Sequence, residues 1–215
     1  MSKKKIIKIL LIILAITILI FLFDLGRKTY ILSKYTNENN KYAEITNFYK
    51  KMTPEEGVTT ELWRKGNLGL LKRTAKDDIK MIYYGEEYNW IIVDSKDKDD
   101  NDSKIAVKMN KEGPGIEMQS LKTGTLDLEN FWNTIKMAFL SRITTEKLDD
   151  IECYKFYMNE EWQMYVNKDN LLVVREKNGS TDTGTIEYKL NVVRDEDVVM
   201  PNLAGYSIND TTQKQ

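Results

Sequence analysis

The most constraining feature of the chain is an apolar run near its N-terminus. Residues 9–23 are apolar except for Thr17. The flanks of the run are charged, with Lys3, Lys4, Lys5 and Lys8 before it and Asp24, Arg27 and Lys28 after it. A membrane-spanning helix needs about 20 residues, and residues 6–25 reach that length when the Lys8 side chain extends to the interface. The run therefore predicts a helix that crosses a membrane.

The residues after the apolar run favour an anchor that is retained over a signal peptide that is removed. Cleavable signals have apolar runs of about 7–15 residues, followed by small residues in an A-x-A-like pattern. Gly26 is small, but Asp24 two residues before it fits that pattern poorly. Cleavage at an atypical site and a buried helix of a soluble protein are the alternatives. Because Lys and Arg collect on the cytoplasmic side, we expect a single pass through the cell membrane, with the N-terminus inside and the remaining chain extracytoplasmic.

The rest of the chain is long enough for one domain with a hydrophobic core. We expect a signal anchor at 1–28, a juxtamembrane stalk at 29–40, a folded domain at 41–208 and a disordered tail at 209–215. Without its four N-terminal lysines the chain has 28 basic and 33 acidic residues, which argues against nucleic acid as a partner. The single cysteine, Cys153, cannot form an internal disulfide, and we expect it to be buried and unreactive.

Two segments have the periodicity of amphipathic helices. The apolar stripe of the first consists of Tyr35, Tyr42, Ile45, Phe48, Tyr49 and Met52. Its polar stretch at 36–40 is expected to act as a hinge. The second, at 128–140, has a stripe made of Leu128, Phe131, Trp132, Ile135 and Phe139. We expect Asp127 to cap this second helix and its stripe to pack against a sheet.

The remaining pattern indicates antiparallel strands. Alternation with a period of two predicts strands at 79–83, 88–92 and 186–192. Residues 151–193 are expected to form a four-stranded antiparallel meander, with a hairpin turn at Asn178 and Gly179. The order of helix, about four strands, helix and four strands predicts an α+β domain in which a curved antiparallel sheet wraps around helices.

The sequence contains no recognisable motif for catalysis or metal binding. It has no histidine, which excludes Ser-His-Asp and Cys-His catalysis and histidine metal ligands. The acidic segment 94–104 begins like an EF-hand loop, but Asp102 replaces the required glycine and Lys108 the bidentate glutamate. We interpret it as a solvated hairpin loop, with weak ion binding as the alternative. Glu160 and Glu161 are interpreted as exposed turn residues. We therefore expect a protein that is not an enzyme and that holds no cofactor or metal.

Aromatic and large apolar residues are the remaining functional signal. Such residues usually fill a core, but between a curved sheet and helices they also line clefts that hold lipids or acyl chains. The candidate cleft residues are Trp63, Met81, Tyr83, Trp90, Phe131, Trp132, Phe139 and Trp162.

The second half of the chain resembles the outer-membrane lipoprotein carrier superfamily (LolA, LolB and RseB-like proteins). The stretch CYKFYMNEEWQMYVNKDNLLVVREKNGS, followed by a long strand and DEDVVMPNLAGY, is similar to the tyrosine-rich strand, Y-V-D-K-x-x-x-L hairpin and proline-containing tail of that family. Asn167 stands where the family has an acidic residue. The resemblance covers residues 40–207. It implies a half-barrel of antiparallel strands with helices on the concave face, and a function in binding rather than catalysis.

Within this superfamily, the chain is similar in size, export signal and expected fold to Gram-positive relatives such as the spore germination lipoprotein GerS of clostridia, a protein partner of a cortex-modifying amidase. It lacks a cysteine for lipid attachment, so a transmembrane anchor would replace the lipid. The resemblance implies a membrane-anchored binding module that is the partner or regulator of a cell-envelope enzyme. A lipid or lipoprotein carrier with an apolar cleft is the alternative, and an envelope enzyme using two facing carboxylates is a third.

Overall fold

The computed structural model describes residues 3–54, 57–76, 78–96, 102–111, 118–121, 126, 128 and 130–212. Helix α1 (Lys3–Ala43) is followed by six strands: β1 (Asn47–Thr53), β2 (Thr59–Lys65), β3 (Leu68–Ala75), β4 (Asp78–Tyr84), β5 (Tyr88–Lys96) and β6 (Asp102–Asn110). Helix α2 (Phe131–Leu140) is followed by β7 (Arg142–Leu148), β8 (Ile151–Asn159), β9 (Trp162–Asn167), β10 (Val173–Asn178), β11 (Thr181–Asp182) and β12 (Thr185–Leu190). A 3-10 helix, η1 (Asp195–Val198), and β13 (Ser207–Asp210) come last.

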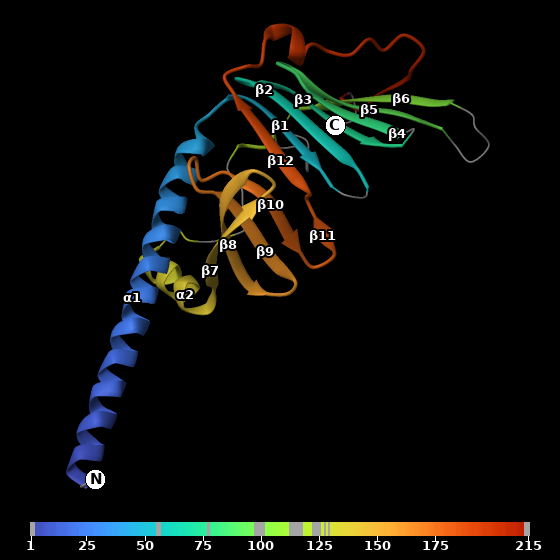
Figure 1. The fold of residues 1–215 in the computed structure, drawn as a ribbon. Coiled ribbons are helices and arrows are strands. Elements are labelled where there is room, and N and C mark those ends of the chain that lie inside the picture. The colour runs from blue at the N-terminus through green and yellow to red at the C-terminus, as the bar shows by residue number, and fades with distance from the viewer. Residues whose placement is uncertain are drawn as a thin grey trace.

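The strands form two sheets, which Figure 1 shows beside the upper part of α1. The larger sheet has eight strands in the order β12-β1-β2-β3-β4-β5-β6-β13, and all its pairs are antiparallel except β6 with β13. The smaller sheet has five strands in the order β11-β10-β9-β8-β7. The α+β class predicted from the sequence is confirmed. The strands are nevertheless divided between two sheets, where one curved sheet was expected.

The predicted strands at 79–83 and 88–92 are confirmed as β4 and β5. The predicted turn at Asn178 and Gly179 joins β10 to β11. The meander differs from the prediction at both ends. Strand β7 adds a strand before it, and β12 leaves it to pair with β1 in the larger sheet. The last strand of the predicted meander therefore connects the two sheets.

Gly184 lies where the chain crosses from the smaller sheet to the larger one. Its φ is +59°, and a Cβ at this position would lie 1.9 Å from the carbonyl oxygen of Thr53 and 2.4 Å from the Cα of Pro54. The left-handed backbone and the close approach both require a residue without a side chain. Asp182 supports this turn, because its Oδ1 accepts a hydrogen bond of 2.9 Å from the Gly184 N–H.

The ion pair between Arg175 and Asp182 makes the stability of this crossing sensitive to acid. The guanidinium donates to both carboxylate oxygens, at 3.1 and 2.7 Å, and holds the pKa of Asp182 below its ordinary value, against the effect of burial. A lowered folded-state pKa stabilises the fold above the unfolded-state pKa of about 3.9. This contribution is lost as the pH falls through the lower, folded-state pKa.

We expect Asp182→Asn to lower the free energy of unfolding by about 0.5–1 kcal/mol near neutral pH and to flatten its decline in acid. Urea unfolding in detergent between about pH 3 and pH 6 measures both effects. Asp150→Asn is the matched control, because the Asp150 side chain is fully exposed. If the free energy of unfolding of Asp182→Asn falls with pH in parallel with that of the unmodified chain, the prediction is contradicted.

Helix α1 runs without a break from the apolar segment into the folded domain. It is long and apolar enough to cross a membrane, and none of its most apolar 18 residues is buried, unlike the core helix of a soluble protein. Further along, Ile31, Leu32 and Tyr35 are buried against the smaller sheet. Residues 36–40, the expected hinge, lie inside the helix. The segment 29–40, expected to be a stalk, is thus packed against the domain.

Helix α1 ends earlier than the tyrosine spacing predicted. Its last residue is Ala43, and Phe48, Tyr49 and Met52 lie on β1. On this strand Phe48 is fully buried and Tyr49 is on the opposite face. Phe48 and Met52, four residues apart, share a face in a helix and in a strand alike. Pairing of β1 with β2 on one side and β12 on the other decides between the two.

Helix α2 is oriented differently from the prediction. Its N-cap is Asn130, whose Oδ1 accepts a 2.8 Å hydrogen bond from the Asn133 N–H; Asp127, the expected cap, lies outside the described residues. The buried side of the helix carries Thr134 and Ala138. These small side chains allow α2 to approach α1 closely, and the two helices are in contact. Phe131, Trp132 and Phe139 of the predicted stripe are exposed instead of packed against a sheet, whereas Leu128 lies before the helix and is buried in the core.

The core consists of two clusters that meet at β12. The first lies between α1, α2 and the smaller sheet and includes the buried Tyr35, Phe156, Met164, Val166 and Val173. The second lies on the larger sheet and includes Phe48, Leu62, Leu71 and Leu121. Tyr188 borders both clusters, and its hydroxyl donates a 2.9 Å hydrogen bond to the carbonyl oxygen of Val173. This contact connects the two sheets through their interior.

Candidate functional site

The structure places the eight predicted cleft residues in three separate regions. Trp63, Met81, Tyr83 and Trp90 lie on one face of the larger sheet, opposite the face that carries Phe48, Leu62 and Leu71. Phe131, Trp132 and Phe139 lie on the exposed side of α2. Trp162 is buried in the core of the smaller sheet. The described residues therefore do not form a single cleft from this set.

Strand register aligns four aromatic residues in one row. Tyr49, Trp63, Leu70, Tyr83 and Trp90 are paired in turn from β1 to β5. Directly paired residues point to the same face of a sheet, and we call this face the aromatic face. The row is basic at both ends, because Lys189 pairs with Tyr49 and Lys108 with Trp90. The sequence identified three members of the row as candidates, but only the register brings them into line.

The chain after β12 crosses the aromatic face to the opposite edge of the sheet (Figure 1). We call this segment, residues 194–206, the strap. Its η1 helix contacts β2 and β3. At the far end the Tyr206 hydroxyl donates a 3.2 Å hydrogen bond to Asp94, and β13 then pairs with β6. Thr211 also donates to the carbonyl oxygen of Lys108, at 2.8 Å. Residues 209–212 belong to the tail that was expected to be disordered, and in the structure β13 and this hydrogen bond attach them to β6.

Asn47 fixes the point where the strap leaves the sheet. Its side-chain amide donates to the carbonyl oxygen of Val193 at 3.1 Å and accepts from the Val193 N–H at 3.0 Å. Its backbone oxygen accepts from the Asn191 N–H at 2.9 Å. Asn191 has a φ of +57°, in the left-handed region that asparagine tolerates better than most residues. These bonds extend the pairing of β1 with β12 and hold Val192 and Val193 beside the aromatic face.

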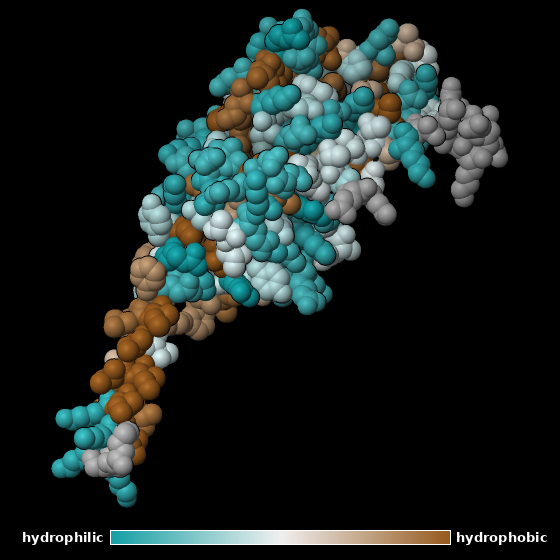
Figure 2. Space-filling model, in the orientation of Figure 1, coloured by the Kyte–Doolittle hydropathy of each residue, from teal (hydrophilic) through white to brown (hydrophobic). Residues whose placement is uncertain are grey.

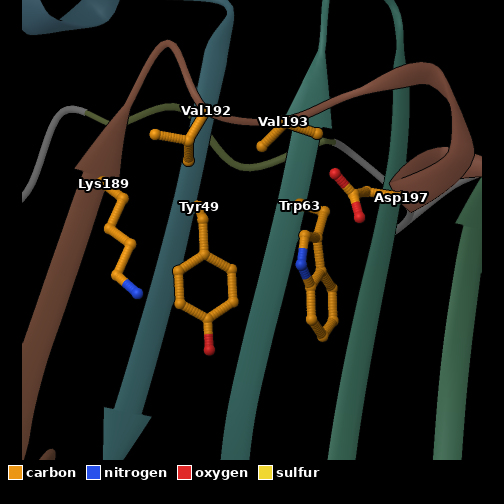
Figure 3. Close-up of a pocket in the computed structure, with 6 residues that line it drawn as sticks. All are labelled: Tyr49, Trp63, Lys189, Val192, Val193 and Asp197. Carbon is orange, nitrogen blue, oxygen red and sulfur yellow. The ribbon is translucent and has the colours of Figure 1, made fainter.

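A pocket opens between this junction and the aromatic row (Figure 3). It has a volume of ≈ 370 Å³ and is lined by Tyr49, Trp63, Lys189, Val192, Val193 and Asp197. Figure 3 shows Lys189, Tyr49 and Trp63 side by side on three neighbouring strands. The two valines lie above them, and Asp197 lies on the side of Trp63, away from Lys189. We call this site the strap pocket.

The floor of the strap pocket is aromatic. The rings of Tyr49 and Trp63 have centroids 5.2 Å apart and an interplanar angle of 48°. The ammonium of Lys189 lies 5.8 Å from the centroid of the Tyr49 ring, within cation–π range. The Tyr49 hydroxyl donates a 2.8 Å hydrogen bond to Glu61. Burial, and then the hydrogen bond and charge of Glu61, raise the pKa of Tyr49, so the hydroxyl remains neutral.

The two ends of the strap pocket carry opposite charges. Lys189 supplies the positive end, and Asp197 supplies the negative end from η1. One carboxylate oxygen of Asp197 accepts a 2.8 Å hydrogen bond from the backbone N–H of Arg194. Lys65 of β2 lies 2.7 Å from the carboxylate of Asp195 and ties η1 to the sheet. With an aromatic floor between the two charges, the site suits binding of an apolar group.

The other candidates from the sequence show no catalytic arrangement in the parts of the chain described. Glu160 and Glu161 are exposed in the turn between β8 and β9, as interpreted. Cys153 is fully buried, and burial raises the pKa of its thiol. Residues 97–101 of the acidic loop lie outside the described residues, while β5 and β6 on either side form the expected hairpin. The described residues contain no group of three or more potential metal ligands.

Fold and site together define an α+β protein of two sheets, with one helix able to cross a membrane and a strap pocket on the aromatic face. No model of a known protein family matches the chain, and no curated protein matches it either.

Proposed function

We propose that the chain is a non-enzymatic binding module, anchored by α1 in the cell membrane, whose extracytoplasmic domain binds a protein partner of the cell envelope. The length of the apolar segment supports a single pass. The lysines before it support an N-terminus on the cytoplasmic side. A relationship to the lipoprotein carrier superfamily and its germination relatives is part of the proposal, and the sequence pattern of the second half supports it.

The strap pocket is the observation that carries the proposal. Its aromatic floor, its two charged ends and its rigid frame resemble the centre of a protein interface, where aromatic anchors supply most of the affinity. A partner segment fits the pocket when it places an apolar side chain on Tyr49 and Trp63. An acidic group of that segment would then face Lys189, and a basic group would face Asp197.

Packing beneath α1 favours this function over lipid carriage. A carrier needs a continuous apolar cavity between its helices and its sheet. In that region Tyr35, Phe156 and Met164 are at most 2% exposed and occupy the space themselves. The tryptophans expected to line such a cavity lie apart from one another. A filled interior with an open surface pocket is the arrangement expected of a protein-interaction module.

A photoreactive amino acid at Val192 tests the proposal in membranes of the producing cells, because Val192 lines the strap pocket. We expect one envelope protein as the crosslinked product, identified by mass spectrometry. With that partner purified, Trp63→Ala is expected to weaken binding by about 2 kcal/mol, or roughly 30-fold. Trp90→Ala is the matched control, since Trp90 lies in the same aromatic row outside the pocket. Equal losses in the two variants, or crosslinks to lipid alone, would contradict the proposal.

A further inference from the structure

Helix α2 exposes an apolar face that the strap pocket does not use. Its outward residues are Phe131, Trp132, Phe139 and Leu140, which are 64%, 75%, 63% and 54% exposed. At 3.6 residues per turn these four side chains fall on one half of the helix. The buried half carries Thr134 and Ala138. A helix with its small side chains inside and its large apolar side chains outside has an interaction surface of its own.

The position of α2 along α1 indicates what covers this surface. The ring of Phe139 packs edge-on against the ring of Phe21 of α1, with centroids 6.1 Å apart and an interplanar angle of 78°. Phe21 belongs to the apolar segment, three residues before Asp24. At a rise of 1.5 Å per residue, Phe21 lies about 5 Å from Asp24 towards the middle of that segment. A side chain packed on Phe21 therefore lies at the depth of the hydrocarbon boundary when α1 spans a membrane.

We propose that α2 is an interfacial helix whose exposed face inserts into the lipid leaflet on the domain side, next to α1. The proposal rests on the membrane anchoring by α1 proposed above. Amphipathic helices at a membrane surface bury their apolar face about 5–10 Å into the headgroup and acyl boundary, and Trp is enriched there. Figure 2 shows the hydrophobic band of α1 reaching the base of the folded part, where α2 lies in Figure 1. Lipid is the occupant that continues this apolar surface.

The charged residues near α2 fit the same placement. Lys136 lies on the exposed side of the helix, and its long stem allows the ammonium to reach the phosphate level. Asp24, the first acidic residue after the apolar segment, is paired with Arg27 at 3.0 Å and Lys28 at 2.9 Å. Arg27 also donates a 2.9 Å hydrogen bond to the carbonyl oxygen of Ile143. This bond joins the anchor to the strand that follows α2 and fixes the helix beside it.

Quenching by brominated lipids tests the proposal on the full chain. The protein is reconstituted into vesicles of phosphatidylcholine and phosphatidylglycerol, with or without bromine on the acyl chains near the headgroup. We expect bromine to quench the tryptophan fluorescence of the unmodified chain, and Trp132→Phe to lose most of that quenching. Trp90→Phe is the matched control and should keep it, because Trp90 lies on the aromatic face of the larger sheet. Near-ultraviolet circular dichroism verifies that both variants are folded.

Alkaline extraction of the same vesicles reports on α1 separately. Protein that resists extraction but is quenched equally in the unmodified chain and in Trp132→Phe would overturn the inference and assign the α2 face to a protein partner. Protein that is extracted would overturn the anchoring on which the inference rests. Resistance to extraction, together with the loss of quenching in Trp132→Phe alone, supports both.

Discussion

Replacement of Gly184 by alanine is expected to lower the free energy of unfolding by about 3 kcal/mol or more. The left-handed backbone at φ +59° costs an alanine about 1–2 kcal/mol. The new Cβ would also meet the Thr53 carbonyl oxygen at 1.9 Å, and a backbone atom cannot rotate away as a side chain can. Relieving an overpacked contact by moving strands costs a further 1–3 kcal/mol or so. The two sheets are joined at this point, so the loss affects the whole domain.

Gly179→Ala separates the backbone effect from the contact. Gly179 has nearly the same φ, +60°, in the neighbouring hairpin, and a Cβ there meets nothing within 4 Å. We expect Gly179→Ala to lower the free energy of unfolding only by the cost of the left-handed backbone, about 1–2 kcal/mol. Urea unfolding in detergent, followed by tryptophan fluorescence, compares the two variants. Equal losses of unfolding free energy in the two variants would mean that the close contact between Thr53 of β1 and Gly184 does not contribute to the cost of adding a Cβ.

Replacement of Leu32 by alanine is expected to lower the free energy of unfolding by about 2–5 kcal/mol. Leu32 is fully buried between α1 and the smaller sheet, in the same cluster as Ile31 and Tyr35. Truncation removes the transfer free energy of the side chain and leaves a cavity that the rigid helix cannot close. A residue in a free stalk would show no such loss, which makes this variant a direct test of how α1 meets the domain.

Tyr30→Ala is the control on the same turn of α1. The Tyr30 side chain is 69% exposed, and exposed substitutions of this kind change stability by about 0.5 kcal/mol or less. Thermal unfolding in detergent measures the midpoint temperature of both variants. If the midpoint temperature of unfolding of Leu32→Ala is no lower than that of Tyr30→Ala, helix α1 does not pack on the domain at this position. Residues 29–40 would then be the stalk expected from the sequence.

The local sequence pattern was sufficient to predict β4, β5 and the hairpin after β10, because alternation and turn residues are properties of a few consecutive positions. It was insufficient for β12. The alternation of that strand specifies which residues are buried but not the strand with which it pairs, and its partner β1 is far away in the sequence. Tyr49 was misassigned for a related reason. Its spacing from Tyr35 and Tyr42 favours a helix, and only its pairing with β2 and β12 assigns it to a strand.

The strap pocket was predicted only in part. Trp63 was among the candidate residues, but Lys189, Val193 and Asp197 were not. Lys189 lies on β12, Val193 lies between β12 and the strap, and Asp197 lies on the strap; only the tertiary fold brings these positions next to β2. The predicted stripe at 128–140 is only partly confirmed, because Phe131, Trp132 and Phe139 lie on α2 but are exposed, while Leu128 precedes the helix and is buried. An apolar stripe shows that water is an unfavourable neighbour, and it does not show what replaces the water.

The unbroken course of α1 works as a spacer of fixed length. From Phe23, the last apolar residue of the run, to Ala43 at the helix end there are about 20 residues, or about 30 Å of helix. Strand β1 and the strap pocket begin just beyond that end. When α1 is anchored in a membrane as proposed, the continuous helix would hold the pocket at a nearly constant distance from the lipid surface. Partners would be selected by where their contact segment stands relative to the membrane, in addition to the chemistry of that segment.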